Sequence, residues 1–215
     1  MSWSRKSPRG KRGYHHGNLR EALVQAALSL IGERGSEGVT LAEAARMAGV
    51  SAAAPYRHFK DREDLMAAVA SEGYSKFADA LERAWEDGNP DPVTALERVG
   101  HAYLAFAREE PALYSAMFES SLSPGADSSM SVQADRAYAV LQTASEDIHA
   151  TLPPAKRAPA RMMALHIWSM AHGIASLFAR GDAGRRPLPV PPEDLLEAGL
   201  LIYLSGLGHD PSATR

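Results

Sequence analysis

Apolar residues recur three and four positions apart along most of the chain, a spacing that predicts amphipathic α-helices. A first helix is predicted from a cap at Asn18 to a stop at Gly35, and a long helix follows a cap at Asp61 and ends near Trp85. Further helices, most of them bounded by proline or glycine, are predicted over residues 93–109, 112–120, 131–152, 155–180 and 192–207. No alternating strand pattern of useful length occurs. With the pair described next, the predicted fold class is all-α, with about nine helices.

Two short helices joined by a glycine turn are predicted between the first helix and the long one. Thr40 can cap the first of them, and Glu43 can return a hydrogen bond to the Thr40 amide, which makes a capping box. Gly49 follows the apolar face of that helix and is free to take the positive φ of a sharp turn. Ser51 is the next capping residue, and Pro55 costs the second helix only its first internal hydrogen bond. Residues 40–60 are therefore predicted to form a helix-turn-helix that docks on DNA.

Spacing alone does not separate a DNA reader from an ordinary structural helix pair, because both contain glycine turns and basic residues. The charge distribution favours the DNA reader. Residues 1–60 hold ten Lys and Arg and four acidic residues, a net charge of +6, whereas the other 155 residues carry a net charge of −9. A basic head on an acidic body is the asymmetry expected of a DNA-binding domain joined to a separate module.

Composition excludes several other classes of protein. The 215 residues are 45% hydrophobic and contain no cysteine, so thiolate metal sites, disulfides and cysteine nucleophiles are excluded. No apolar run approaches the roughly 20 residues of a membrane span, and the basic residues 1–13 lack the apolar stretch of a secretory signal. The sequence also lacks a Gly-rich phosphate loop, a Gly-x-Ser-x-Gly elbow and a His-Glu-x-x-His motif. We therefore expect a cytoplasmic protein with a flexible basic arm at 1–14, no membrane association, no enzymatic activity, no cofactor and no metal site.

The motif Tyr56-Arg57-His58-Phe59, preceded by the capping box and Gly49-Val50-Ser51 and followed by Lys60 and Leu65, resembles the TetR/AcrR family of bacterial transcriptional regulators. The later motif Trp168-Ser169-Met170-Ala171-His172-Gly173 resembles the Trp-His-Gly (WHG) signature of one branch of that family. The resemblance implies a homodimer with a TetR-type DNA-binding domain at 15–62. It also implies a regulatory domain at 63–209 that binds a small effector and dimerises through its last two helices, with a tail at 210–215.

The resemblance places Thr40, Tyr56, His58 and Lys60 on the phosphate backbone of DNA. Hydroxyl, imidazole and ammonium groups at helix ends are chemically suited to donate to phosphate oxygens. Base readout is then left to the start of the second short helix and to nearby cations, namely Ser51, Ala52, Ala53, Ala54, Arg46 and Arg57. Three alanines can touch a thymine methyl but donate no hydrogen bond, so we expect specificity to depend also on Arg46, the arm, dimer spacing and DNA shape.

Aromatic and methionine side chains in the second half form a candidate effector pocket, because methionine packs around varied shapes. The candidates are Tyr103, Phe106, Met117, Phe118, Met162, His166, Trp168, Met170 and His172. Such a set is more often plain core. His172, on the same helix face as Trp168, is more often a buried histidine satisfied by a carbonyl than a ligand contact, and both interpretations stay open.

A glycine inside a helix costs ~1 kcal/mol relative to alanine, which makes a close helix crossing the expected reason for Gly173. A crossing at a dimer interface is the hypothesis, and the residues predicted to form that interface are Gly173, Leu177, Leu196, Leu200, Tyr203 and Leu204.

Together these features predict a ligand-responsive repressor that binds a near-palindromic operator as a homodimer. Its two recognition helices would enter successive major grooves about one helical turn apart. A small apolar or amphipathic effector would release it. The alternative is a DNA-binding or interaction module that has no small-molecule effector and is constitutive or controlled by a protein partner. Stabilisation of the folded chain by members of a metabolite panel would discriminate between the two.

Overall fold

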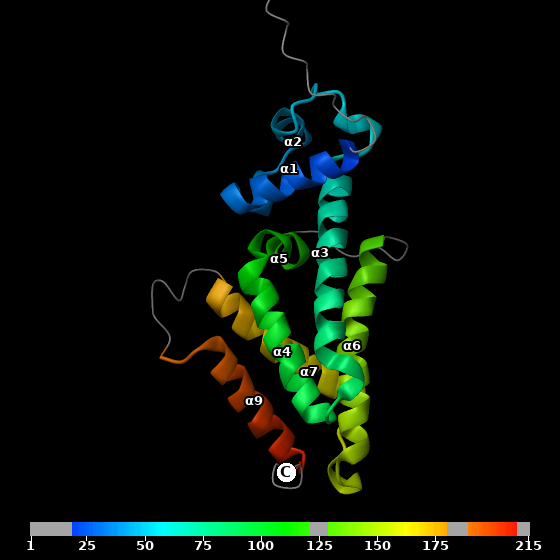
Figure 1. Ribbon diagram of the computed structural model, residues 1–215, viewed down its shortest axis with the longest axis vertical. Helices are drawn as coiled ribbons and strands as arrows, with labels where there is room; N and C mark the ends of the chain where they lie inside the picture. Colours follow the sequence, from blue (N-terminus) through cyan, green and yellow to red (C-terminus); the bar gives the residue numbers. More distant parts are fainter. Residues whose placement is uncertain (1–18, 121–128, 180–188, 210–215) are drawn as a thin grey trace, which may run out of the picture.

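The computed structural model describes residues 19–120, 129–179 and 189–209, and every regular element within these ranges is helical. This confirms the all-α prediction. Figure 1 shows a small head, which contains α1 and α2, above a larger body. The α-helices are α1 (Leu19–Arg34), α2 (Leu41–Met47), α3 (Arg62–Trp85), α4 (Pro92–Glu109), α5 (Pro111–Phe118), α6 (Ser129–Thr151), α7 (Ala160–Ala179) and α9 (Pro192–Gly206). Four 3₁₀ turns lie at Ser36–Gly38, Pro55–Arg57, Glu86–Gly88 and Pro154–Lys156.

Three predicted features lie outside the described ranges: the arm at 1–14 with the Asn18 cap, the end of the helix predicted over 155–180, and the tail at 210–215. None of the described helices is long and apolar enough to cross a membrane.

Helix α3 joins the head to the body. It begins in the head and runs down beside α4, α5 and α6 (Figure 1). The predicted cap is confirmed, because the Asp61 side chain accepts a hydrogen bond from the Asp64 amide at 2.9 Å. An apolar stripe from Leu65 to Leu81 is buried along its length. On its outer side, Arg136 of α6 pairs with Asp79 at 2.6 Å, which ties α6 to this helix. Displacement of α3 would therefore move head and body relative to each other.

The head is packed around buried apolar side chains. Leu23, Ala27 and Leu30 of α1 are buried together with Phe59 and Leu65, and these residues are continuous with the core of the body. Helix α1 stops at Gly35, as predicted, and this glycine has φ 81°. The segment that follows is held by Arg62, whose Nε donates to the Val39 carbonyl at 2.8 Å and whose Nη2 donates to the Ser36 carbonyl at 2.6 Å. The start of α3 is thus fixed to the connection that leads into α2.

In the body, α9 lies close against α4 and α7 because glycines line the crossings. A Cβ built on Gly100 of α4 would lie 2.7 Å from Leu196 Cδ2, and one on Gly199 of α9 would lie 2.5 Å from Met170 Sδ. Both positions therefore exclude any larger residue unless the neighbouring side chain moves. The leucines of α9 that face this crossing are buried in the protomer.

Helix α7 begins later than predicted. A 3₁₀ turn at Pro154–Lys156 precedes it, and the regular helix starts only at Ala160. The amides of Met162 and Met163 bond to the Pro159 carbonyl at 2.8 and 3.1 Å. The prolines between 153 and 159 lack the N–H groups that a continuous helix would need, which explains the delay.

Candidate functional site

The entrance to α2 is fixed by three side chains. The Thr40 hydroxyl accepts a hydrogen bond from the Glu43 amide at 3.2 Å, which confirms the predicted N-cap. The same hydroxyl donates to Glu43 Oε2 at 3.0 Å, and Arg34 Nη1 donates to Glu43 Oε1 at 2.7 Å. The carboxylate was expected to accept from the Thr40 amide, but it instead binds the hydroxyl and the guanidinium. The Thr40 hydroxyl is thus engaged as both donor and acceptor inside the head.

The segment after the Gly49 turn differs from the predicted second helix. Backbone hydrogen bonds between residues three apart join the Ala54 amide to the Ser51 carbonyl at 3.0 Å and the His58 amide to the Pro55 carbonyl at 2.8 Å. Only Pro55–Arg57 is regular, as a 3₁₀ turn. Because Pro55 has no N–H, the i to i−4 bond to Ser51 that would open an α-helix cannot form.

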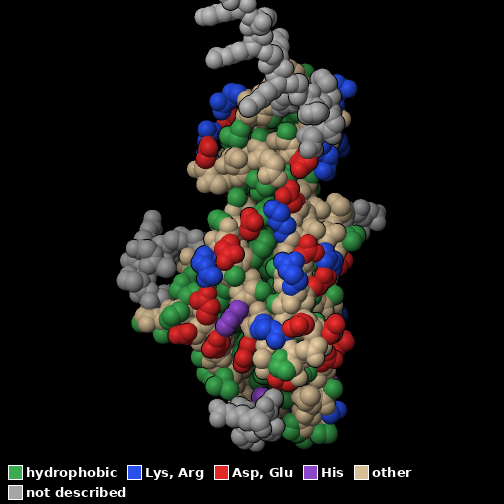
Figure 2. Space-filling view, in the orientation of Figure 1, with side chains coloured by type: hydrophobic (Ala, Val, Ile, Leu, Met, Phe, Trp, Pro, Cys, Tyr) green, Lys and Arg blue, Asp and Glu red, His purple; other side chains and the backbone are tan. Residues whose placement is uncertain are grey.

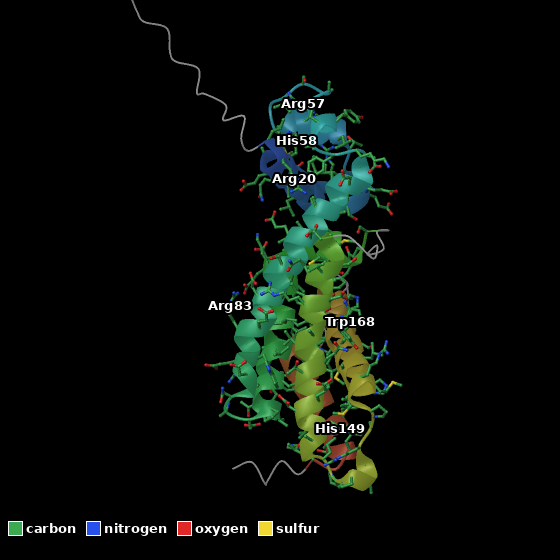
Figure 3. The ribbon with its side chains drawn as sticks, turned by 90° about the vertical axis from the view of Figure 1, so that its right-hand side faces the viewer. Arg20, Arg57, His58, Arg83, His149 and Trp168 are labelled. Carbon is green, nitrogen blue, oxygen red and sulfur yellow. The ribbon has the colours of Figure 1, made fainter. Side chains whose placement is uncertain are left out.

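The polar side chains of this segment all face outward. Tyr56 is 63% exposed, whereas the neighbouring Phe59 is 1% exposed and anchors the segment in the head core. Arg57 and His58 lie at the end of the head farthest from the body (Figure 3). The remaining exposed residues of this surface are Thr40, Arg46, Ser51, Ala52, Ala53 and Lys60, and Ala54 is half-buried. These residues, which we call the head surface, are the ten that were predicted to contact DNA.

Positive charge on the described head lies mainly around this surface. Figure 2 shows Lys and Arg side chains at both edges of the head and many acidic side chains on the body. Five of the ten basic residues of 1–60 lie in residues 1–18, outside the described part. Arg20 was not among the predicted contacts. Its guanidinium carbon lies 5.3 Å from the centre of the Phe59 ring, beside the head surface.

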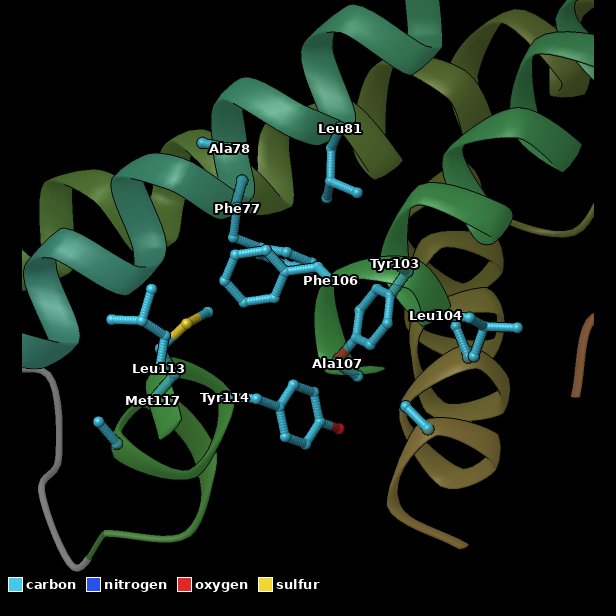
Figure 4. Close-up of a cluster of buried hydrophobic side chains, with 14 of the residues drawn as sticks. Phe77, Ala78, Leu81, Tyr103, Leu104, Phe106, Ala107, Leu113, Tyr114 and Met117 are labelled. Carbon is cyan, nitrogen blue, oxygen red and sulfur yellow. The ribbon is translucent and has the colours of Figure 1, made fainter. Parts of the chain in front are cut away.

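The body contains a cavity of about 310 Å³ between α3, α4, α6 and α7, and Phe118 at the end of α5 also lines it. Aromatic rings form much of its wall, namely Tyr74, Phe77, Tyr103, Phe118, Tyr138 and Trp168. The rings support one another. Phe77 and Tyr103 meet edge to face with centroids 4.9 Å apart, and Tyr138 and Trp168 lie 5.7 Å apart. The side of the wall formed by Phe77 and Tyr103 belongs to the buried cluster in Figure 4.

A hydrogen-bonded group lies behind the cavity. His172 Nδ1 is 3.0 Å from the hydroxyls of both Tyr103 and Tyr114. The hydrogen-bond partners of this nitrogen are therefore two hydroxyls. The more common case expected for His172 was a hydrogen bond to a carbonyl. Burial raises the pKa of Tyr74 to about 12 and raises that of Tyr103 further, so both phenols stay protonated at neutral pH. Within the described ranges, no three His, Asp or Glu side chains come together as a metal site requires.

Comparison with protein families decides the class. Residues 23–69 match the family model described as bacterial regulatory proteins, tetR family. Residues 96–202 match the model described as a tetracyclin repressor-like C-terminal domain. The chain belongs to the TetR family. The narrower resemblance to the Trp-His-Gly branch stays a prediction.

Individual relatives agree with this assignment. A 101-residue stretch of this TetR-family chain is 37% identical to the HTH-type transcriptional regulator BetI of Rhizobium meliloti strain 1021, and it covers 46% of the chain but only 50% of BetI. The uncharacterized HTH-type regulator YobS of Bacillus subtilis strain 168 is 26% identical over 195 residues, which are 89% of the chain and 93% of YobS. A solved structure from Rhodococcus sp. RHA1, of unknown function, is 30% identical with a TM-score of 0.76 and covers 93% of this chain and 100% of its own. The protein is therefore a DNA-binding transcriptional regulator of the TetR family, and BetI and YobS are both described as HTH-type transcriptional regulators.

The structure brings together only part of the predicted effector set of this TetR-family protein. Tyr103, Phe118 and Trp168 line the cavity, and Phe106, Met117 and His172 pack in or next to the core around it. The other three lie elsewhere. Met162 is 48% exposed, His166 Nδ1 is 3.1 Å from the Tyr203 hydroxyl, and Met170 packs on Gly199.

Three rings that line the cavity were not among the predicted effector residues. Tyr74 and Phe77 lie on the apolar face of α3, and Tyr138 lies on α6. The helical period marks these residues as inward-facing. It does not reveal that α3, α4, α6 and α7 leave a space between them.

The predicted dimer residues also divide into two groups. Leu196, Leu200 and Leu204 are 1%, 2% and 2% exposed within the protomer, so they leave almost no surface for a second copy. Gly100 of α4 makes room for two of them, Leu196 and Leu200, to pack inward. Leu177 is 53% exposed, and a Cβ on Gly173 would meet nothing within 4 Å. The expected close crossing at Gly173 is therefore not made within the described part of the protomer.

Proposed function

We propose that this TetR-family regulator is a ligand-responsive repressor that binds a near-palindromic operator as a homodimer and is released by a small apolar or amphipathic effector. One observation carries the proposal. Helix α3 supplies Tyr74, Phe77 and Leu81 to the cavity wall, and the same helix begins in the head, next to Lys60 of the head surface. A molecule in the cavity would therefore touch the helix that positions the DNA-binding domain.

The head surface is suited to hold DNA through its backbone. Tyr56, His58 and Lys60 are exposed and can donate to phosphate oxygens. The Thr40 hydroxyl is already engaged with Glu43, so the free amides at the start of α2 are the better phosphate donors at that end. Sequence readout falls to Arg46, Arg57 and the exposed residues 51–53, with Arg46 and Arg57 as the side chains able to form bidentate contacts to a base.

The outer faces of α7 and α9 support the proposed homodimer. On α7, Met162, Leu165 and Leu177 are 48%, 37% and 53% exposed. A Cβ built on Gly173 of the same helix would likewise meet nothing within 4 Å. On α9, Leu201 and Ile202 are 53% and 74% exposed. Apolar residues on two neighbouring helices form a patch that a second copy of the same chain can bury. A dimer of this kind places two heads at a fixed spacing for two operator half-sites.

Release by an effector follows from the difference in its affinity for two states. A molecule that binds the cavity more tightly when α3 is displaced would favour a state in which the two heads no longer match the operator spacing. The effector cannot shift the equilibrium between the two states by more than that difference in affinity. The proposed displacement would have to overcome the packing of α3 on α6, including the Arg136–Asp79 pair.

Operator binding and effector response can be tested together. DNase footprinting on the DNA upstream of the protein's own gene should protect a near-palindromic site. Members of a metabolite panel that raise the melting temperature of the free protein should then weaken the footprint. Protection that no stabilising metabolite relieves would favour the alternative, a constitutive or protein-controlled DNA-binding module.

A further inference from the structure

The segment that begins the second element of the helix-turn-helix presents almost only methyl groups. Ser51, Ala52 and Ala53 are exposed on the head surface, and Ala54 is half-buried. In a helix-turn-helix, the first residues of the second element lie in the major groove and contact the edges of the bases. The groove would therefore meet one hydroxyl and two exposed methyl groups at the position where direct readout is made.

The amino acids around this segment limit which bases it can distinguish. Residues 44–60 contain no Asn or Gln, which bind adenine through two hydrogen bonds, and no Asp or Glu, which accept from cytosine. Arg46 and Arg57 can bind guanine. Thymine is the base that presents an apolar group in the major groove, its C5-methyl, and an alanine methyl can pack against it. Ala52 and Ala53 can thus select thymine, whereas they give no hydrogen bond to any base.

The backbone of this segment is held in place at the tip of the head. The Ala54 amide donates to the Ser51 carbonyl at 3.0 Å, and the His58 amide donates to the Pro55 carbonyl at 2.8 Å. Pro55 is buried, and Arg57 and His58 lie at the end of the head farthest from the body (Figure 3). Side chains as small as alanine let such a backbone approach the base edges closely, which contact between two methyl groups requires.

We propose that Ala52 and Ala53 read operator DNA through the C5-methyl groups of thymine, so that each half-site carries thymines that pack against these two residues. Burial of one methyl group is worth about fourfold in affinity. Two contacts in each of two half-sites would multiply to roughly 250-fold, a substantial part of the preference for a specific site over other DNA, which is about a thousandfold or more. This inference rests on the proposed operator-binding function and names the base chemistry that the operator must offer.

The test starts from the DNA that the protein itself prefers. The full chain selects a site from a pool of random duplexes, and each thymine of that site is then replaced in turn by deoxyuridine. Deoxyuridine keeps the hydrogen-bonding groups of thymidine and lacks only the methyl group. Fluorescence anisotropy gives the affinity of each duplex. We expect a loss of about fourfold at one or two thymines in each half-site and little change at the others.

Ala52→Gly and Ala53→Gly each remove one of the two methyl groups on the protein. Each variant should abolish the deoxyuridine penalty at the thymine that its residue contacts, and the double variant should show no penalty. Glycine can also loosen the segment and weaken binding to all duplexes, but a loss common to both duplexes leaves their affinity ratio unchanged. Ala155→Gly is the matched control. Ala155 is an exposed alanine in another 3₁₀ turn, Pro154–Lys156 of the body, so this variant should keep every penalty.

The proposal is overturned if a site with deoxyuridine at every thymine binds as tightly as the original, or if no duplex is enriched. It is also overturned if the penalties persist in the double glycine variant, which would assign them to another apolar side chain such as the exposed Met47. Failure of the proposed function gives a different result. A selected site without two-fold symmetry, with the penalties intact, would support the thymine contacts and contradict the homodimeric operator. A near-palindromic site without any penalty would do the reverse.

Discussion

At the start of α2, three side chains hold one another in place through a chain of hydrogen bonds. Thr40 caps the helix and donates its hydroxyl hydrogen to one carboxylate oxygen of Glu43, and Arg34 of α1 donates to the other. The guanidinium thereby offsets a carboxylate that would otherwise repel the DNA backbone near the head surface. Each contact is local, and their contributions to stability should differ because a cap and an exposed ion pair differ in strength.

Thr40→Ala should lower the free energy of unfolding by about 1 kcal/mol, because the Glu43 amide loses its acceptor. Glu43→Gln should cost about 0.5 kcal/mol or less, since it removes a partly exposed ion pair and leaves the cap in place. Urea unfolding followed by circular dichroism measures both. A larger loss for Glu43→Gln than for Thr40→Ala would show that the carboxylate and not the hydroxyl holds this helix end.

Lys60 and His58 make a separate prediction about DNA. Lys60→Ala should weaken binding to all sequences alike and reduce the slope of log affinity against log salt by about 1, because one phosphate contact is lost. His58→Ala should also weaken binding. Fluorescence anisotropy on operator DNA at several salt concentrations gives both quantities. Lys76→Ala is the control, since Lys76 lies on α3 in an ion pair with Glu72 and should leave affinity and slope unchanged. An unchanged slope in Lys60→Ala would remove that residue from the phosphate contacts.

At the scale of the elements, helix packing depends on glycines that the helical period does not identify as special. Gly100 lets Leu196 of α9 approach α4, and Gly73 of α3 lets Met117 of α5 approach in the same way, with Sδ 2.7 Å from a Cβ built there. These crossings hold α5 and α9 against the helices that form the cavity wall. Loss of a crossing should therefore loosen the body without touching the head surface.

Gly100→Val should lower the free energy of unfolding by about 1–3 kcal/mol, because the added methyls would overlap Leu196 in a packed seam. Gly32→Val is the matched control. Gly32 lies in α1, and a Cβ there meets nothing within 4 Å, so its change should stay within about 0.5 kcal/mol. The comparison uses thermal or urea unfolding of both variants. A Gly100→Val protein as stable as the parent would mean that α9 can move away from α4 at little cost.

The helix boundaries were largely predictable, because they depend on local chemistry. Asp61 and the apolar period that follows it were enough to predict α3. The segment after Ser51 was not predicted correctly, because Pro55 removes the amide that would open an α-helix, and a chain of 3₁₀ bonds replaces it. The orientation of α9 was also predicted incorrectly, because the leucines assigned to a dimer interface are buried within the protomer. Its apolar residues surround much of the helix, and only the position of Gly100 on another helix decides that Leu196 turns inward.

The presence of the cavity could not be predicted either, because it also depends on how several helices pack together. The sequence marked Tyr103, Phe118 and Trp168 as candidates by residue type, and these do line it. Tyr74 of α3 and Tyr138 of α6 lie 64 positions apart in the chain. Only the folded arrangement places them on one wall. A pattern on one helix predicts which face is buried, and the shape left between several helices depends on all of them.

At the scale of the whole molecule, the head surface and the exposed apolar face of α7 and α9 lie on separate parts of the chain, with α3 and the cavity between them. A dimer formed through α7 and α9 would hold the two bodies together and leave both heads able to meet DNA. Operator affinity should then depend on residues of α9 that are far from the DNA. This dependence separates the dimer proposal from one in which each head binds alone.

Ile202→Glu tests the dimer directly. Ile202 is 74% exposed on α9, so the substitution should barely affect the stability of the protomer, yet it would place two unpaired carboxylates in the proposed interface. Sedimentation of the parent at micromolar concentration should show a dimer and that of the variant a monomer. Affinity for a full operator should fall to about that for a single half-site. Val132→Glu, at a 63% exposed position on α6, should change neither property. A dimer that persists in Ile202→Glu, or a parent that sediments as a monomer, would place the assembly surface elsewhere and leave head spacing unexplained.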